Sequence, residues 1–256
     1  MVPSLKTVTA SEIKALGISL IDNTSLNLND TPDVISALVK KSLAAKPYTA
    51  AVCVYPAHVK QCVEELKGTG VTVATVVNFP KGDVSPEAVL EETAFSVRSG
   101  ADEVDMVVDY KDIIENRAGG LQRAEELVRA VKGACGSAML KVIIESGELK
   151  DEDLIKEASR AAIRGGADFI KTSTGKVPVN CTPEAARAML EVIKEMEKPV
   201  GFKGAGGIKT YEDTKFYLLM AEDIMGAGWV TRDNFRFGAS SLLGVLRDGA
   251  VVSASY

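Results

Sequence analysis

Several features that define common classes of protein are scarce or missing in this sequence. There is one histidine, His58, so zinc sites built on several histidines are excluded. No apolar run approaches the roughly 18 residues needed to span a bilayer, and no basic block or aromatic-studded basic face occurs. We therefore expect no membrane-spanning segment and no nucleic-acid partner.

The four cysteines form no CxxC pair and are scattered through stretches that we expect to lie in the core. No signal-peptide pattern precedes them, so they indicate reduced thiols in a cytoplasmic protein. With 46% hydrophobic residues, 25% charged residues and a formal net charge of −5, the composition is typical of a soluble globular protein. Its length allows two small domains or one large α/β barrel.

Short β-rich runs alternate with longer helical stretches along the chain. The expected strands are "SLID" (19–22), "AAVCVY" (50–55), "TVATVVN" (72–78), "DEVDMVV" (102–108), "AMLKVIIE" (138–145), "DFIK" (168–171), "VGFK" (200–203) and "FRFG" (235–238). Between them we expect helices near 33–45, 57–67, 86–99, 120–134, 152–165, 183–196 and 211–221.

Three of these helices open with a cap residue followed by proline at the first helical position, which is a helix-start signal. The three starts are Thr31-Pro32-Asp33, Ser85-Pro86-Glu87 and Thr182-Pro183-Glu184. Glycines such as Gly68 and Gly100 close other helices. The boundaries of the alternating elements are therefore marked in the sequence.

Eight strands with seven intervening helices predict a (β/α)8 TIM barrel, with an additional N-terminal helix over 5–16. The alternative is a doubly wound open sheet, which would usually carry a GxGxxG or Walker loop near its first strand. Neither motif is present. Because no linker or shift in composition divides the chain, we expect a single domain over residues 1–256.

Charged residues occupy inward positions on four consecutive expected strands. Alternate residues of a barrel strand face the lumen, and the C-terminal strand ends carry the chemistry. Counting by two places these charged side chains inside: Glu103, Asp105, Lys141, Glu145, Lys171 and Lys203. Glu103 and Lys141 fit a structural ion pair.

Lys171 and Lys203 fit a purely structural role less well. Two ammonium groups at one layer of strand ends repel each other, so at least one pKa should be lowered. A neutral lysine amine is a nucleophile for carbonyls. The pattern therefore favours an amine nucleophile at the barrel mouth.

Two glycine-containing loops, 203–210 and 236–244, follow the last two strands, where many barrels bind phosphate. Glycines permit close backbone approach, and Ser240 and Ser241 would open a last helix whose N-terminus favours an anion. Lys176 adds a cation on the same rim. The alternative is that these loops are only tight turns, but two lysines nearby favour a phosphate site.

Together these residues resemble the deoxyribose-phosphate aldolase family, the class I aldolases of deoxynucleoside breakdown. The matching motifs run through most of the chain: "LIDNTSL" (20–26), "GADEVDMVV" (100–108), "LKVIIESGEL" (140–149), "ADFIKTSTGK" (167–176), "VGFKGAGGIKT" (200–210), "RFGASSLL" (236–243) and "SASY" (253–256). One departure is Gly204, because many members have proline after the preceding lysine, and this is expected to loosen the loop.

The resemblance implies that Lys171 forms a Schiff base and that Asp105 and Lys203 serve proton transfer. It implies phosphate contacts by a further set: Gly175, Lys176, Gly206, Gly207, Gly238, Ser240 and Ser241. The implied auxiliary residues are Asp22, Thr24, Thr174 and Tyr256, with Tyr256 assisting proton exchange from a mobile tail. Cys53 is expected to pack rather than react.

The reaction implied is reversible cleavage of 2-deoxy-D-ribose 5-phosphate to D-glyceraldehyde 3-phosphate and acetaldehyde. The lysine iminium is the electron sink, so no cofactor and no metal are expected. The partners expected are phosphosugars, aldehydes, and a second copy of the chain in a homodimer or higher homo-oligomer. The alternatives are a transaldolase or ketose-phosphate aldolase, and a non-catalytic phosphosugar-binding barrel.

Overall fold

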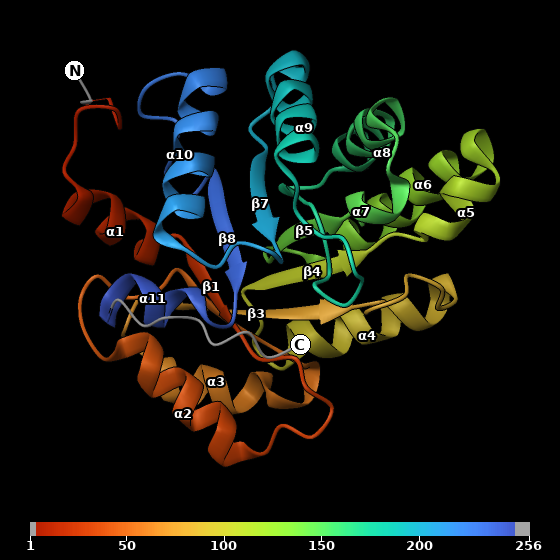
Figure 1. Cartoon of the computed structure of the whole chain (residues 1–256). Helices are drawn as coiled ribbons and strands as arrows, with labels where there is room; N and C mark the ends of the chain where they lie inside the picture. The colour runs from red at the N-terminus through yellow and green to blue at the C-terminus, as the bar shows by residue number, and fades with distance from the viewer. Residues whose placement is uncertain (1–3, 249–256) are drawn as a thin grey trace.

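The computed structural model describes residues 4–248 and contains a closed barrel of eight parallel strands in the order β1 to β8 (Figure 1). The strands are β1 (Ile21–Thr24), β2 (Ala51–Val54), β3 (Thr72–Val77), β4 (Glu103–Val107), β5 (Met139–Ile143), β6 (Phe169–Lys171), β7 (Gly201–Ala205) and β8 (Phe235–Ala239). The predicted (β/α)8 TIM barrel is confirmed.

Helices surround this barrel, and one precedes its first strand (Figure 1). They are α1 (Ala10–Ser19), α2 (Pro32–Leu43), the 3₁₀ turn η1 (Pro56–His58), α3 (Val59–Leu66), α4 (Pro86–Arg98), α5 (Tyr110–Glu115), α6 (Arg117–Cys135), α7 (Ser146–Leu149), α8 (Glu152–Gly165), α9 (Pro183–Met196), α10 (Tyr211–Met225) and α11 (Leu242–Asp248).

The predicted cap residues begin the helices they mark. Thr31, Ser85 and Thr182 each accept a hydrogen bond from a first-turn backbone N–H, with proline at the first helical position. The additional N-terminal helix is confirmed, but its predicted start at residue 5 is wrong. It begins after Thr9, which forms a reciprocal capping box with Glu12.

Two helices on the C-terminal side of the strands were not predicted. Asp109 caps the short α5 through the backbone N–H of Asp112, and Asn116 then caps α6, which begins three residues earlier than expected. The four-residue α7 directly follows Glu145. Each element is too short, or too directly joined to its neighbour, to give a clear 3.6-residue period.

Strand register closes the barrel and aligns the chemistry-bearing residues. Ile21 of β1 pairs with Phe237 of β8, which joins the first strand to the last. Lys171 of β6 pairs with Lys203 of β7. Strand β7 extends to Ala205, so Gly204 lies inside a strand rather than in the loop that follows it, and its effect on that loop stays a prediction.

Alternation along the strands separates an apolar layer from a charged lumen. On β4, Val104 and Met106 belong to the main hydrophobic core, while Glu103 and Asp105 carry buried charges. Glu145 departs from this pattern. It lies beyond the end of β5 in a left-handed conformation, so its predicted place among the lumen charges is wrong.

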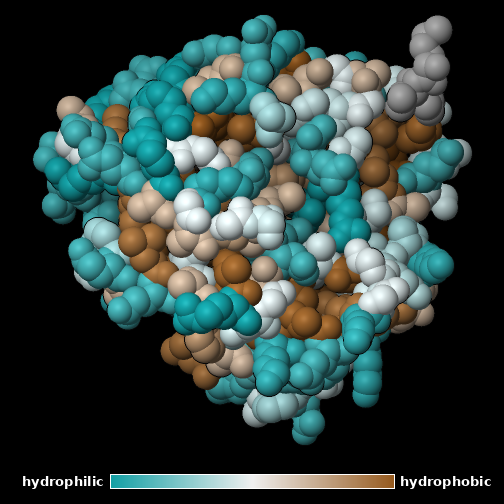
Figure 2. Space-filling model, turned by 180° about the vertical axis from the view of Figure 1, so that it is seen from behind, coloured by the Kyte–Doolittle hydropathy of each residue, from teal (hydrophilic) through white to brown (hydrophobic). Residues whose placement is uncertain are grey.

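Figure 2 shows one face of the molecule, where hydrophilic side chains surround separate hydrophobic patches. Within residues 4–248 no helix is long and apolar enough to cross a membrane. The single domain over 1–256 stays a prediction, since residues 1–3 and 249–256 lie outside the described part of the chain.

Candidate active site

Seven charged side chains form one ion-paired cluster inside the barrel. Four are cations and three are carboxylates, and each residue is at most 4% exposed. The members are Asp22, Glu103, Asp105, Lys141, Lys171, Lys203 and Arg236. If all were ionised, the cluster would hold one uncompensated positive charge.

Asp105 stands at the centre of this cluster. Its Oδ2 accepts hydrogen bonds from Lys171 Nζ and from Lys203 Nζ, both at 2.7 Å, and its Oδ1 accepts from Lys141 Nζ at 2.9 Å. Burial alone would raise the pKa of Asp105, but the three lysines hold it well below its usual range. Asp105 is therefore an anion that orders three lysine nitrogens around it.

Lys203 has a second carboxylate partner. Its Nζ donates to Asp22 Oδ2 at 2.5 Å in addition to Asp105. Burial works to lower the pKa of Lys203, but Asp105 and Asp22 outweigh it, so this pKa is raised. Lys203 is thus the fixed cation of the pair.

Lys171 differs from the other buried lysines in the direction of its pKa. Burial is the largest cause, and together with the Lys203 charge it outweighs the attraction of Asp105, so the pKa of Lys171 is lowered. The expectation that one of the two lysines has a lowered pKa is confirmed. The pKa of Lys141 is raised instead, because three carboxylates outweigh its burial.

The lower layer of the cluster is held by Glu103, Lys141 and Arg236. Lys141 Nζ donates to Glu103 Oε2 at 2.5 Å, which confirms the predicted structural pair. Arg236 bonds both Glu103 and Asp22 and lies over the ring of Phe169, 5.7 Å from its centroid. Arg236 was missed, although strand alternation in "FRFG" would have placed it inward.

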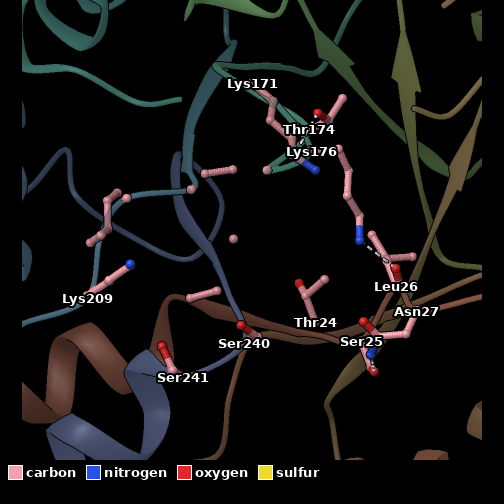
Figure 3. A pocket seen from close by; sticks show the side chains of 17 residues that line it. Thr24, Ser25, Leu26, Asn27, Lys171, Thr174, Lys176, Lys209, Ser240 and Ser241 are labelled. Atoms are coloured by element: carbon pink, nitrogen blue, oxygen red, sulfur yellow. Dashed lines mark hydrogen bonds between the residues drawn. The ribbon is translucent and has the colours of Figure 1, made fainter. Parts of the chain in front are cut away.

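A pocket of about 330 Å³ opens above Lys171 at the C-terminal ends of the strands (Figure 3). All seven predicted phosphate contacts line it, together with Lys171 and the auxiliary residues Thr24 and Thr174. Additional lining residues were not predicted: Ser25, Leu26, Asn27, Ala205, Ile208, Lys209 and Ala239. The two glycine-containing loops and the segment after β6 therefore surround one cavity.

Three of the lining glycines need backbone that other residues rarely adopt. Gly175, Gly206 and Gly207 have φ of 80°, 75° and 82°. A Cβ at Gly206 would also lie 2.6 Å from Cβ of Asn180. This wall is consequently made of backbone, and it leaves room for a ligand to approach closely.

Two lysines approach the pocket from different loops (Figure 3). Lys176 Nζ donates to the carbonyl oxygen of Leu26 at 2.8 Å. Lys209 lies across the pocket from Leu26 and Asn27. Lys209 was missed because a lone lysine in a loop carries no periodic signal, although it directly follows the glycine loop.

The remaining predicted residues lie beneath the pocket or outside the described chain. Asp22 does not line the pocket, since its carboxylate is fully buried against Lys203 and Arg236. Cys53 is buried, and burial raises the pKa of its thiol to about 11, so it remains protonated at neutral pH and packs as expected. Tyr256 lies outside the described residues.

No group of three or more histidine, cysteine or acidic side chains within residues 4–248 could hold a metal ion. The expectation of no metal and no cofactor stays a prediction, as do the roles of the individual site residues. The barrel, the cluster of charges at its strand ends and the cavity above them define a barrel enzyme with a buried lysine site.

A family model described as DeoC/LacD family aldolase matches residues 17–247. The chain belongs to this family and is an aldolase, a carbon–carbon lyase. Among solved structures, a candidate deoxyribose-phosphate aldolase from Toxoplasma gondii ME49 in its apo form is 31% identical, with a TM-score of 0.87 over 93% of this chain and 96% of that one.

Two more solved structures are similar to this chain. A candidate deoxyribose-phosphate aldolase from Coccidioides immitis is 32% identical, with a TM-score of 0.80 over 97% of this chain and 90% of that one. A deoxyribose phosphate aldolase from Aeropyrum pernix, described as tetrameric, is 24% identical, covers 96% of this chain and 94% of that one, and has a TM-score of 0.73. At that identity the likeness shows the fold alone.

Proposed function

We propose that this aldolase reversibly cleaves 2-deoxy-D-ribose 5-phosphate to D-glyceraldehyde 3-phosphate and acetaldehyde through a Schiff base on Lys171. Support for the substrate comes from the names of the relatives from Toxoplasma gondii and Coccidioides immitis, and from the pocket lined by backbone and lysines. The proposed reaction belongs to the breakdown of deoxyribose phosphate.

One observation carries the proposal. Of the three lysines in the buried cluster, Lys171 alone has a lowered pKa and alone lines the pocket. A lysine nucleophile must be both unprotonated and accessible to a carbonyl. Lys171 is the one of the three whose pKa is shifted toward the neutral amine and whose side chain reaches the pocket, while the pKa values of Lys141 and Lys203 are raised and neither lines the pocket.

In the first stage, neutral Lys171 attacks C1 of the open-chain aldehyde and forms a carbinolamine. Loss of water gives an iminium, in which the nitrogen carries the positive charge and draws electrons from the substrate. Asp105 lies within hydrogen-bond distance of the Lys171 nitrogen, so its carboxylate stabilises that charge. Lys203 remains bonded to the same oxygen and, as a cation, is able to supply a proton.

In the second stage, the C3 hydroxyl loses its proton and the bond between C2 and C3 breaks. The electrons of that bond move to form an enamine, and glyceraldehyde 3-phosphate leaves. We assign the proton transfer to Asp105, directly or through a water, with Lys203 as its relay. Protonation of the enamine at C2 and hydrolysis of the resulting iminium release acetaldehyde and restore Lys171.

The phosphate end is proposed to sit against the backbone wall of the pocket. Amide groups at Gly206 and Gly207, the hydroxyls of Ser240 and Ser241, and the Lys176 ammonium are suited to a phosphate dianion. Thr24, which lines the same pocket beside Ser240, is proposed to contact a substrate hydroxyl. This arrangement anchors the substrate with its aldehyde directed down toward Lys171.

The cytoplasmic location and the homodimer or higher homo-oligomer stay predictions. A substrate panel tests the function directly, with 2-deoxyribose 5-phosphate, fructose 1,6-bisphosphate and fructose 6-phosphate incubated separately and the released aldehydes measured. We expect acetaldehyde only from the deoxyribose ester, with activity retained in a strong chelator. Cleavage of a ketose phosphate instead would favour the ketose-phosphate alternative.

A further inference from the structure

A buried carboxylate that the proposed chemistry does not use lies next to the pocket. Glu145 follows the end of β5 and is 0% exposed, with a left-handed backbone at φ 52°. Among the described residues no ion pair involves this carboxylate, and it does not line the pocket. A buried carboxylate in an uncommon backbone conformation calls for a physical role.

Within residues 4–248, Thr174 donates every hydrogen bond that the Glu145 carboxylate accepts. The Thr174 hydroxyl donates to Oε2 at 2.6 Å, and the Thr174 N–H lies 3.2 and 3.3 Å from the two carboxylate oxygens. The Thr174 hydroxyl in turn accepts the backbone N–H of Lys176 at 3.0 Å. A chain of hydrogen bonds therefore runs from Glu145 through Thr174 to the pocket lysine.

The rest of the turn after β5 holds the same loop. Ser146 N–H donates to the Thr172 carbonyl oxygen at 2.8 Å. Gly147 packs so closely against Val179 that an added Cβ would lie 1.9 Å from the Val179 carbonyl oxygen. The loop between β6 and α9 thus rests on the segment 145–149 at its start, at Thr174 and near its end.

The nucleophile itself is held differently. Lys171 belongs to strand β6, whose register is fixed by β5 on one side and β7 on the other. Glu145 therefore supports the part of the loop that faces the phosphate end of the pocket more directly than it supports the reacting nitrogen.

We propose that Glu145 is a positioning residue that sets the preference for phosphorylated over unphosphorylated aldehyde substrates, acting through Thr174 on the loop that carries Gly175 and Lys176. The proposal rests on the function proposed above, because it assumes that this end of the pocket takes the phosphate. Loss of the Glu145 carboxylate releases the loop and weakens binding of the phosphate, while the covalent chemistry at Lys171 proceeds.

The test compares two substrates that differ only in the phosphate, 2-deoxyribose 5-phosphate and 2-deoxyribose, on wild type and Glu145→Gln. We expect KM for the phosphate ester to rise about tenfold, as for the loss of a charge-assisted hydrogen bond. The kcat/KM for 2-deoxyribose should change less than about twofold. Inorganic phosphate should also inhibit cleavage of the phosphate ester less strongly in Glu145→Gln than in wild type, and this loss of inhibition should parallel the rise in KM.

Glu148→Gln is the matched control, since Glu148 lies in the same turn, is half-buried and has no recorded side-chain hydrogen bond among the described residues. It should resemble wild type on both substrates. If Glu145→Gln does not fold, Glu145→Asp keeps the charge but shortens the reach of the carboxylate toward Thr174, and it provides the same comparison.

Equal losses on both substrates, or no loss on either, would overturn the positioning role. Failure of the proposed function has a different signature. In that case wild type itself would cleave neither compound, so there would be no activity for inorganic phosphate to inhibit. The two outcomes are therefore separated by the wild-type measurement alone.

Discussion

Lys171 and Lys203 are register partners on neighbouring strands, and both donate to one oxygen of Asp105 at 2.7 Å. Lys203 also bonds Asp22, whereas Lys171 has Asp105 as its only ion-pair partner among the described residues. Because the cluster contains one more cation than anion, deprotonation of Lys171 balances its charge. The same arrangement that buries the lysine thus lowers its pKa, as the proposed role of a nucleophile requires.

Replacing Lys171 by methionine should abolish cleavage while preserving the fold. We expect activity to fall by about 10³-fold or more, because the iminium cannot form. Methionine fills a similar volume and removes the surplus buried charge, so the melting temperature should equal or exceed that of wild type. Steady-state assays and thermal unfolding of the same preparation measure both effects. A large fall in melting temperature would contradict the surplus-charge argument.

Lys203→Met should move the pH dependence of Schiff-base formation. The Lys203 charge helps to lower the pKa of Lys171, so its removal raises that pKa, and the freed Asp105 raises it further. The rate at which acetaldehyde is trapped on Lys171 with borohydride increases with pH as Lys171 loses its proton. In Lys203→Met the rising part of this pH–rate curve should therefore shift to higher pH.

Exposed Lys198, replaced by methionine, is the control for removing a lysine elsewhere. The rising part of the pH–rate curve of this variant should coincide with that of wild type. A shift of the Lys203→Met curve toward lower pH would show that Lys203 does not act through its charge on Lys171.

Gly206→Ala should weaken binding of the phosphate ester. The positive φ of Gly206 costs alanine about 1–2 kcal/mol in stability, and the added Cβ meets the side chain of Asn180. We expect KM for the phosphate ester to rise, with a smaller effect on the unphosphorylated sugar. Gly68→Ala is the control, since Gly68 has φ of 78° with nothing within 4 Å of an added Cβ. If Gly206→Ala and Gly68→Ala had equal KM values for the phosphate ester, the loop at Gly206 would have no part in binding the phosphate.

The buried carboxylates should make the free energy of unfolding depend on pH in the acid range. The ordinary pKa of an aspartate is 3.8, and in the folded chain burial raises the pKa of Asp22, but Lys203, Arg236 and Lys141 outweigh it and lower the net value. A carboxylate with a lowered folded pKa stabilises the fold above its unfolded pKa, and this stabilisation is lost as the pH falls toward the folded pKa. The free energy of unfolding should therefore decrease as the pH falls below about 4.

Asp22→Asn should reduce that dependence on pH, measured by urea unfolding between about pH 7 and pH 3. It should also destabilise the protein near neutral pH by about 3–5 kcal/mol, because Lys203 and Arg236 lose a buried partner. Exposed Glu64, changed to glutamine, is the control and should leave the curve unchanged. An unaltered pH dependence in Asp22→Asn would contradict the assignment of the acid sensitivity to this cluster.

The barrel and its inward charges could be predicted because strand alternation and helix capping depend only on residues close together in the sequence. The two-residue period of a strand places Asp105, Lys171 and Lys203 in the lumen once the strands are recognised. Cap residues such as Thr31 and Ser85 act within one helical turn. Motifs at successive strand ends converge because parallel strands end at the same mouth.

Other features depend on contacts between distant segments, which periodicity does not encode. The bond from Lys176 to the Leu26 carbonyl oxygen joins residues 150 positions apart. Glu145 has the inward parity of a strand residue, but its left-handed backbone redirects it to Thr174. Arg236 has the inward parity of its strand, but alternation does not show which groups it meets, because its partner carboxylates Asp22 and Glu103 lie on other strands.

Covalent capture with sodium borohydride tests the central claim most directly. The full-length protein is incubated with 2-deoxyribose 5-phosphate or acetaldehyde, reduced, digested and mapped by mass spectrometry. We predict one ethyl group on Lys171 from acetaldehyde, no modification of Lys141 or Lys203, and no capture in Lys171→Met. Cleavage of the substrate without any modification of Lys171, or capture on Lys203 instead, would contradict the proposed role of Lys171.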